Sequence, residues 1–383
     1  MSRALREQIT QKILDLIRAD EVDYQGESWE TSSGRYTDEA RFEAEREQLF
    51  LNRPQLAAFS ADLPNPGDYY ATSIAGRPIL LARDSKGMLR AFMNACRHRG
   101  VQLADGCGNT SGFTCPYHGW TYGSDGILIS VPSQKAFDPR HLENRSLIQL
   151  PVSEKVGLIL VHPDQTGIID FDEFLGPIQS LVADCQYQDL RFLREYRASV
   201  PMNWKLAVDG MIEAYHVPYL HSTTVGLRTL PQFVHLDFGF HQLLASPGPE
   251  ILELRNKRPD EWPEFPFYMT TAIFPNTIIG GGGYEGGYAS FQRSDPGDRP
   301  GSSDYIFRLY AAGKEPVPGI AEQQEMVAAL LMETQIDEDL RAHISAQKMM
   351  DAGVVPSIVF GAREPNISRR HRLYDQIIGA NEM

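Results

Sequence analysis

Two short stretches of the chain each contain one cysteine and one histidine. Cys96 and His98 are separated by one residue in "NACRHRGVQL", and Cys115 and His118 are separated by two residues in "FTCPYHGW". Two thiolates and two imidazoles form a soft set of ligands, which suits zinc or an iron–sulfur cluster. Structural zinc sites usually take Cys–Cys and His–His pairs from separate elements, whereas each stretch here supplies one ligand of each type. This division favours a [2Fe–2S] cluster in which one iron takes both thiolates and the other takes both imidazoles, with zinc as the alternative.

A second set of candidate metal ligands lies in the stretch "NWKLAVDGMIEAYHVPYLH". On a helix Asp209, Glu213 and His216 follow one another at spacings of four and three residues, and they therefore share one face. Pro218 is expected to end this helix just after His216, which lets His221 turn back towards the same point. Two histidines and one carboxylate from elsewhere form a facial triad, which binds Fe(II) and leaves positions open for O₂. We therefore expect a mononuclear iron site here.

The first pair of motifs is expected to lie in a small β domain. Residues 77–95 read as two strands joined by a turn at 84–87, and residues 120–130 read as another hairpin. Both Cys–His pairs then fall in loops between hairpins.

The second set is expected in a mixed domain. Antiparallel strands are predicted at 269–293 and 303–312, and helices at 321–335 and 337–353. Strands followed by long helices are typical of an α+β domain.

The chain therefore divides into three predicted parts. Residues 1–50 form an N-terminal helical segment that packs on the catalytic domain, residues 51–150 form the cluster domain, and residues 151–383 form the mononuclear-iron domain.

Both sets of motifs resemble those of one known family. "CRHRG" and "CPYHGWTY" resemble the Rieske loops of the α subunits of non-haem iron ring-hydroxylating oxygenases, and the histidine-containing stretch is similar to their catalytic-iron motif. The Rieske proteins of respiratory cytochrome complexes carry additional cysteines in these loops. This chain has Val101, Pro116 and Tyr117 at those places, which disfavours that relationship.

The resemblance implies both a fold and an activity. The fold is α+β, with a Rieske [2Fe–2S] β domain inserted in or preceding a catalytic domain of the helix-grip type. The implied protein is a terminal oxygenase that activates O₂ at a mononuclear Fe(II) with electrons from its Rieske cluster, and that hydroxylates an aromatic or related small organic substrate. The alternative is a Rieske N- or O-demethylase of methylated amines, including quaternary amines, or of methoxy-aromatics. A more remote alternative is a Rieske electron carrier without oxygenase activity.

The resemblance also implies partners. Electrons come from a separate NAD(P)H-dependent reductase, with or without a ferredoxin. The chain has no glycine fingerprint for a dinucleotide after a predicted strand, which agrees with an external donor. A homotrimer places the cluster of one copy beside the iron of the next, bridged by the carboxylate at Glu213. Ring dioxygenases more often have Asp at that position, and Glu there is found in relatives that act on other substrates, including quaternary amines. Asp209 is assigned a supporting role behind the ligands.

The third iron ligand is expected in the C-terminal helical region. Asp337, Glu338 and Asp339 are the candidates for the carboxylate that joins His216 and His221. Asp337 is well placed to cap the following helix. The pattern around Asp339 is similar to that around the ligating aspartate of the family, so Asp339 is the predicted ligand.

Composition and charge bound the remaining possibilities. The net charge of −14 argues against nucleic acid as a partner, and the one basic cluster, at 368–372, is expected to be a solvated or inter-subunit face. No apolar run approaches the ~20 residues of a membrane helix, and the first residues do not read as a signal peptide, so a soluble cytoplasmic protein is expected. Candidates for the substrate pocket are Phe233, His235, Phe238, Phe240, Tyr268 and Tyr288, although side chains of this kind more often belong simply to the core.

Overall fold

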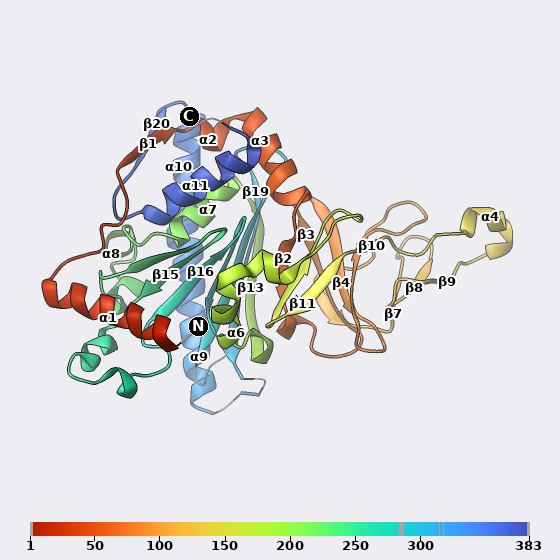
Figure 1. Cartoon of the computed structure of the whole chain (residues 1–383). Coiled ribbons are helices and arrows are strands. Elements are labelled where there is room, and N and C mark those ends of the chain that lie inside the picture. The colour runs from red at the N-terminus through yellow and green to blue at the C-terminus, as the bar shows by residue number, and fades with distance from the viewer. Residues whose placement is uncertain (1–2, 283–286, 314, 317, 381–383) are drawn as a thin grey trace. The chain divides into compact units, whose positions relative to one another are not determined.

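The structure is a computed structural model that describes residues 3–282, 287–313, 315–316 and 318–380 (Figure 1). The chain forms two compact units. The smaller unit comprises residues 50–174, and the larger unit comprises residues 1–49 and 175–383. The smaller unit is therefore inserted into the larger one. In the part of the chain that is described, no helix is both long enough and apolar enough to cross a bilayer.

The smaller unit ends later than the predicted boundary at 150. Strands β11 (Val152–Lys155) and β12 (Leu158–Val161) form an antiparallel pair, and β12 also pairs with β2 (Gln55–Phe59). These pairings hold the segment after 150 within the smaller unit, and hydrophobic patterning along the chain does not reveal such long-range partners.

Short antiparallel strands build the rest of the smaller unit. The turn predicted at 84–87 joins two of them, because Asp84 accepts the Gly87 N–H at 2.9 Å and Gly87 has a φ of +79°. One sheet has the order β10-β5-β4-β3-β6, and a second has the order β7-β8-β9. Their bounds are β3 (Asp68–Ile74), β4 (Arg77–Arg83), β5 (Leu89–Met93), β6 (Cys107–Asn109), β7 (Gly112–Thr114), β8 (Thr121–Gly123), β9 (Leu128–Ser130) and β10 (Gln149–Leu150).

A seven-stranded antiparallel sheet is the framework of the larger unit as far as it is described. Its order is β13-β19-β18-β17-β16-β15-β14. The strands are β13 (Leu190–Val200), β14 (Val234–Phe238), β15 (His241–Ser246), β16 (Tyr268–Ile273), β17 (Thr277–Gly281), β18 (Tyr288–Pro296) and β19 (Ser303–Ala312).

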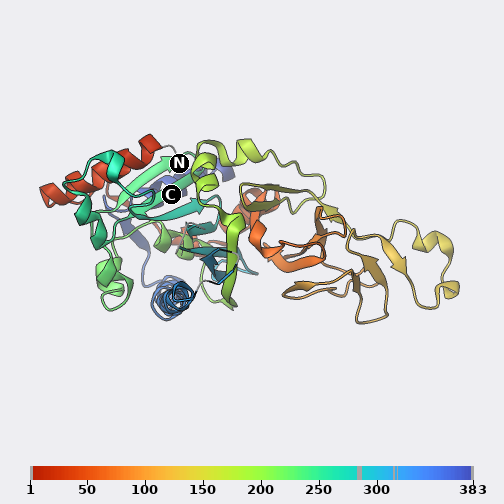
Figure 2. The same ribbon diagram turned by 90° about the horizontal axis from the view of Figure 1, so that it is seen from below.

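Helices pack against this sheet through one apolar core. Tyr305, Phe307 and Leu309 alternate along β19 and so point to one face, where they join Ala207 of α7 (Trp204–Met211) and Ala328 of α9 (Ile320–Glu333). Figure 2 shows the C-terminal helical run almost end-on beside the sheet.

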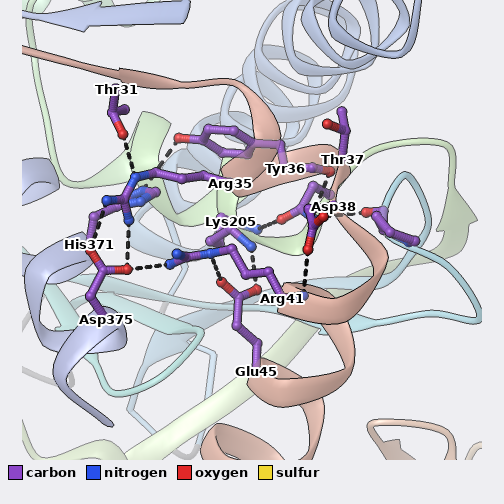
Figure 3. A network of polar contacts seen from close by, with 12 residues as sticks. Thr31, Arg35, Tyr36, Thr37, Asp38, Arg41, Glu45, Lys205, His371 and Asp375 are labelled. Carbon is purple, nitrogen blue, oxygen red and sulfur yellow. Dashed lines mark hydrogen bonds and ion pairs between the residues drawn. The ribbon is translucent and has the colours of Figure 1, made fainter. Parts of the chain in front are cut away.

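Side chains from four helices meet in a buried ionic network (Figure 3). Lys205, on the first turn of α7, pairs with Glu45 of α3 (Glu39–Glu45). Arg41 bridges Glu45 at 2.7 Å and Asp375 of α11 (Pro365–Ile378) at 2.8 Å. Arg35 of α2 (Gly34–Thr37) donates to both oxygens of Asp375 at 2.8 and 2.7 Å. All five side chains are buried, so each charge depends on its partners for compensation.

The basic cluster at 368–372 is not a solvated face, contrary to the expectation. Arg370 and His371 are both 0% exposed. Arg370 donates to the Gln242 side chain at 2.7 Å and to the carbonyls of Ala272 and Pro275 at 3.0 Å. These three acceptors are supplied by the sheet and the turn after β16, so the arginine ties α11 to the sheet.

The ionic network predicts a large cost for removing one of its charges. In Glu45→Gln the neutral amide leaves the buried charges of Lys205 and Arg41 without their carboxylate. We expect the free energy of unfolding to fall by ~3–5 kcal/mol in urea denaturation. The matched control is Glu325→Gln, which removes the carboxylate of an exposed pair with Arg194 and should cost less than ~1 kcal/mol. Equal, small losses in both variants would contradict the argument.

Candidate metal centres

The two Cys–His loops of the smaller unit close in the same way. In the first loop the Cys96 N–H donates to the Val101 carbonyl at 2.8 Å, and the Gly100 N–H donates to the Cys96 carbonyl at 2.9 Å. The second loop repeats both bonds around Cys115, at 2.8 and 3.0 Å. Gly100 and Gly119 have φ values of +80° and +70°, where a side chain would be strained. Each glycine therefore permits the tight turn that presents its loop's thiol and imidazole.

The four predicted cluster ligands lie in one core. The Cys96 and Cys115 side chains are each only 3% exposed, and the rings of His98 and His118 are 4.8 Å apart. His98 stacks on Trp120, and its Nδ1 is buried without a hydrogen-bond partner in the described structure. Burial lowers the pKa of His98, assisted by His118 and a nearby arginine, and so favours the neutral ring that binds metal. Two buried thiols beside an unpartnered imidazole nitrogen fit a [2Fe–2S] cluster.

Tyr122 contacts this ligand set through its hydroxyl group, which sequence reasoning did not identify. Its oxygen accepts the Arg97 N–H at 2.9 Å and lies 3.4 Å from the Cys96 sulfur. Burial raises the pKa of Tyr122, and the thiol of Cys96 adds to the shift, so the phenol keeps its proton. The hydroxyl proton is therefore available to the sulfur, and such bonds stabilise the reduced cluster.

The predicted iron ligands of the larger unit converge on one point. His216, His221 and Asp339 each offer a ligand atom, and these atoms lie within 4.8 Å of one another. Asp339 Oδ1 is 3.1 Å from His221 Nε2 and 3.7 Å from His216 Nε2. Two imidazoles and a carboxylate in this arrangement fit a mononuclear Fe(II) with open positions.

Two further carboxylates hold the outer nitrogens of the same rings. Glu213 Oε1 contacts His216 Nδ1, and Glu338 Oε2 is 2.6 Å from His221 Nδ1. Each Nδ1–H therefore has an acceptor, which leaves both Nε2 atoms to a metal. Burial disfavours the charged form of both rings, but the carboxylates outweigh it and raise the pKa of His216 and of His221.

The helix that carries Asp209 ends before Glu213 and His216, earlier than the predicted end just after His216. Helix α7 ends before Glu213, and α8 (Val217–Leu220) begins after His216 with Pro218 in its first turn. The Glu213 carboxylate accepts the His216 backbone N–H at 3.3 Å and also that of the preceding residue. Because the side chain satisfies these donors, the backbone can leave the helix and form the loop that presents His216.

Asp339 and Glu338 lie in a π-helical stretch, η9 (Thr334–Leu340). This stretch continues from α9 into α10 (Arg341–Asp351) without the break that the sequence suggested. Asp337 therefore does not cap a helix, since the residue at the N-cap position of α10 is Leu340. The side chain of Asp339 is on the side of His216 and His221, whereas Asp337 is exposed.

Asp209 lies deeper in the larger unit than Glu213. It accepts a hydrogen bond from the Tyr36 hydroxyl at 2.7 Å and contacts His371 Nε2 at 3.1 Å. In the described part of the chain these are its side-chain partners, and neither His216 nor His221 is among them. Its place supports a role in holding α7, and neither Tyr36 nor His371 carried a sequence signal for this contact.

Comparison with protein families identifies both units. Residues 53–151 match the Rieske [2Fe–2S] domain, and residues 187–380, half of the chain, match the catalytic domain of the ring-hydroxylating alpha subunit. The chain belongs to the ring-hydroxylating alpha subunit family. The predicted family and its two cofactors, a Rieske cluster and a mononuclear iron, are thereby confirmed.

Several Rieske oxygenase relatives match this chain over part of their own length. The carnitine monooxygenase oxygenase subunit of Acinetobacter baumannii is 32% identical over 196 residues, which cover 51% of this chain and 53% of that protein. The chloroplastic choline monooxygenase of Spinacia oleracea is 34% identical over 197 residues, or 49% of this chain and 44% of that one. The chain thus matches about half the length of these relatives. The large oxygenase component of salicylate 5-hydroxylase from Ralstonia is 28% identical and covers 64% of this chain and 67% of that protein.

Solved structures of Rieske oxygenases share the fold. The quaternary ammonium Rieske monooxygenase CntA in complex with L-carnitine aligns with a TM-score of 0.76 at 22% identity, over 91% of this chain and 95% of that one. Naphthalene 1,2-dioxygenase from Rhodococcus sp. aligns with a TM-score of 0.75 at 22% identity, over 97% of this chain and 98% of that one. The predicted α+β fold is confirmed.

Removal of the Tyr122 hydroxyl group should change the reduction potential of the cluster. Tyr122→Phe removes the O–H···S bond while keeping the ring, so the cluster should form with a lower potential in redox titration followed by visible spectroscopy. Tyr117→Phe is the control, because that exposed tyrosine lies between two cluster ligands in sequence and removes a hydroxyl of the same kind. An unchanged potential in Tyr122→Phe, or the same shift in both variants, would contradict the proposed bond.

Substitutions of the carboxylates around the candidate iron site should differ in their effect on iron binding. Asp339→Ala should lose the mononuclear iron in metal analysis while keeping the visible spectrum of the cluster. Glu338→Gln should weaken iron binding by ~10–100-fold, because a neutral amide replaces the charged acceptor behind a ligating ring. The exposed neighbour Asp337→Asn should bind iron normally. If Asp337→Asn loses the iron and Asp339→Ala retains it, the ligand assignment is wrong.

Proposed function

We propose that this chain is a terminal oxygenase that oxidises a carbon atom bonded to the nitrogen of a small quaternary ammonium compound. The observation that carries the proposal is the convergence of His216, His221 and Asp339 in a chain that also has a Rieske domain. An electron carrier needs no second metal site of this kind, and a structural zinc protein needs neither cluster nor oxygen-binding iron.

The residues of the larger unit have separate tasks in this proposal. His216, His221 and Asp339 hold the iron on one side. Glu213 and Glu338 fix the orientation of the two imidazoles through their Nδ1 atoms. When bound, the iron supplies O₂ activation and the Rieske cluster supplies one electron at a time.

The relatives support a quaternary ammonium substrate over the aromatic substrate that was first expected. The matches with more than 30% identity include carnitine and choline monooxygenases, and both names denote compounds with a trimethylammonium group. Glu213 agrees with this class, since the resemblance associates Glu at that position with substrates other than aromatic rings. Aromatic hydroxylation is the second candidate, because the salicylate hydroxylase component matches a longer part of the chain.

The proposed reaction balances as a monooxygenation. One oxygen atom enters a C–H bond beside the cationic nitrogen, and the other becomes water with two electrons and two protons. A hydroxyl group on that carbon loses its proton as the C=O bond forms and the C–N bond breaks, and the bonding electrons go to nitrogen, which releases a tertiary amine, an aldehyde and a proton. For an N-methyl group the aldehyde is formaldehyde. The electrons come from a separate NAD(P)H-dependent reductase, with or without a ferredoxin.

Transfer between copies of the chain is part of the proposal. A homotrimer would bring the cluster of one copy to the iron of the next, with Glu213 as the bridge. One solved relative is described in terms of inter-subunit electron transfer. In this chain Glu213 contacts the Nδ1 of His216, which supports a role for its carboxylate beside the iron ligand.

A single-turnover assay tests the proposal without knowledge of the reductase. The metal-loaded chain is reduced chemically under anaerobic conditions and then mixed with O₂ and one candidate substrate. We expect up to one aldehyde per active site from carnitine, choline or a related compound, and no product from Asp339→Ala. Hydroxylated salicylate or naphthalene as the main product would favour the second candidate. Absence of any oxidised product from the whole panel would contradict the oxygenase assignment for these substrates.

A further inference from the structure

A small cavity lies against the loop that carries His216. Its volume is about 10 Å³, enough for one water-sized group. Ala214 and Tyr215, the two residues between Glu213 and His216, form part of its wall. The other lining residues come from three segments that are distant in sequence: Val22, Asp23, Pro231, Phe233, His235 and Arg363.

The walls of this cavity are held together by the N-terminal segment. The Gly26 N–H donates to the Ala362 carbonyl at 2.9 Å, which places the segment after α1 (Arg3–Ala19) beside the loop that carries Arg363. A side chain at Gly26 would meet the Ala362 carbonyl oxygen at 3.1 Å, so the two backbones are in close contact. The cavity is therefore a built feature of the larger unit.

His235 is the polar side chain that this cavity leaves unsatisfied. It is 5% exposed, and neither ring nitrogen has a hydrogen-bond partner among the described residues. Burial lowers the pKa of His235 to about 4, so the ring is neutral near pH 7 and offers one N–H donor and one acceptor. Buried polar groups in native proteins almost always have partners, and a group that occupies the cavity can provide one.

One carboxylate and three positive side chains act on the same imidazole. The Arg363 guanidinium lies 5.4 Å from the centre of the Tyr215 ring, and no carboxylate of the described chain pairs with it. Lys12 and Arg369 also act on His235 electrostatically. The opposing carboxylate, Asp23, is already paired with Lys12 at 2.6 Å. The site therefore combines a neutral N–H donor with an uncompensated arginine, which suits an anion.

We propose that this cavity receives one oxygen of the carboxylate of a zwitterionic quaternary ammonium substrate, with His235 donating a hydrogen bond and Arg363 supplying charge. The inference rests on the proposed function and deepens it by naming betaines as the substrate class. The cavity borders the two residues between Glu213 and His216, so a carboxylate oxygen bound there lies against the loop that carries His216. A free small carboxylate has the same chemistry, so the experiment separates the two sources.

Equilibrium binding to the anaerobic, metal-loaded chain tests this assignment. Titration calorimetry compares γ-butyrobetaine, which has a carboxylate, with choline, which has none, and with acetate as the free carboxylate. Arg363→Gln should weaken γ-butyrobetaine binding by ~10–100-fold and leave choline binding unchanged. His235→Phe should weaken γ-butyrobetaine binding in the same selective way. Arg255→Gln, which removes an exposed arginine outside the cavity, is the control and should bind all three as the wild type does.

Each outcome distinguishes the cavity from the proposed function. Equal weakening for γ-butyrobetaine and choline, with unchanged melting temperature, would overturn carboxylate recognition by Arg363. Unchanged binding in both cavity variants would mean that the cavity holds only water. If the wild type binds neither quaternary amine but binds acetate in an Arg363-dependent manner, the anion site stands and the proposed function is wrong. Selective loss of γ-butyrobetaine, without comparable acetate binding, supports the substrate as the source of the carboxylate.

Discussion

The buried pair of Lys205 and Glu45 is the constraint on which the iron site depends. An ammonium group in the core is tolerated only beside its carboxylate, so the first turn of α7 must remain against α3. Four residues further along α7, Asp209 receives the Tyr36 hydroxyl and contacts His371 of α11. Two successive turns of α7 are thus fixed to the N-terminal segment and to the C-terminal helix. The loop with Glu213 and His216 starts where this anchored helix ends, so the position of the ligand follows from contacts made well before it in the chain.

The carboxylates of the candidate iron site differ in the imidazole nitrogen that they face. Asp339 faces the Nε2 atoms, while Glu338 and Glu213 face the Nδ1 atoms of His221 and His216. Asp339 and Glu338 are adjacent, yet they contact opposite nitrogens of the same ring. They do so from a π-helical stretch, a wider turn that is frequent at functional sites because it changes the direction of side chains relative to an α-helix. A ligand and its supporting residue can then come from consecutive positions.

Residues whose chemistry shows in a short motif could be predicted from the sequence. Features that depend on a hydrogen-bond partner brought close only by folding could not. Cys96 and His98 could be predicted as ligands because their types and spacing carry the chemistry by themselves. The break in the helix before Glu213 was missed because it depends on a side chain that binds the backbone ahead of it, which hydrophobic periodicity does not report. Arg370 looked like a surface cation for the same reason. Its acceptors, such as the Ala272 carbonyl, are about a hundred residues away and are brought to it only by the folded sheet.

The length of the Glu213 side chain fits the geometry of its loop. Between Glu213 and His216 the backbone is not helical, so the carboxylate must turn back to reach both the ring Nδ1 and the backbone N–H groups. The length of the glutamate side chain allows its carboxylate to reach the ring Nδ1 as well as the backbone N–H groups. A carboxylate has about four acceptor sites, and the Glu213 contacts described here use three of them: one at His216 Nδ1 and two at backbone N–H groups. The proposed bridge between subunits would place a donor from a second copy of the chain at the site that these contacts leave on Oε1.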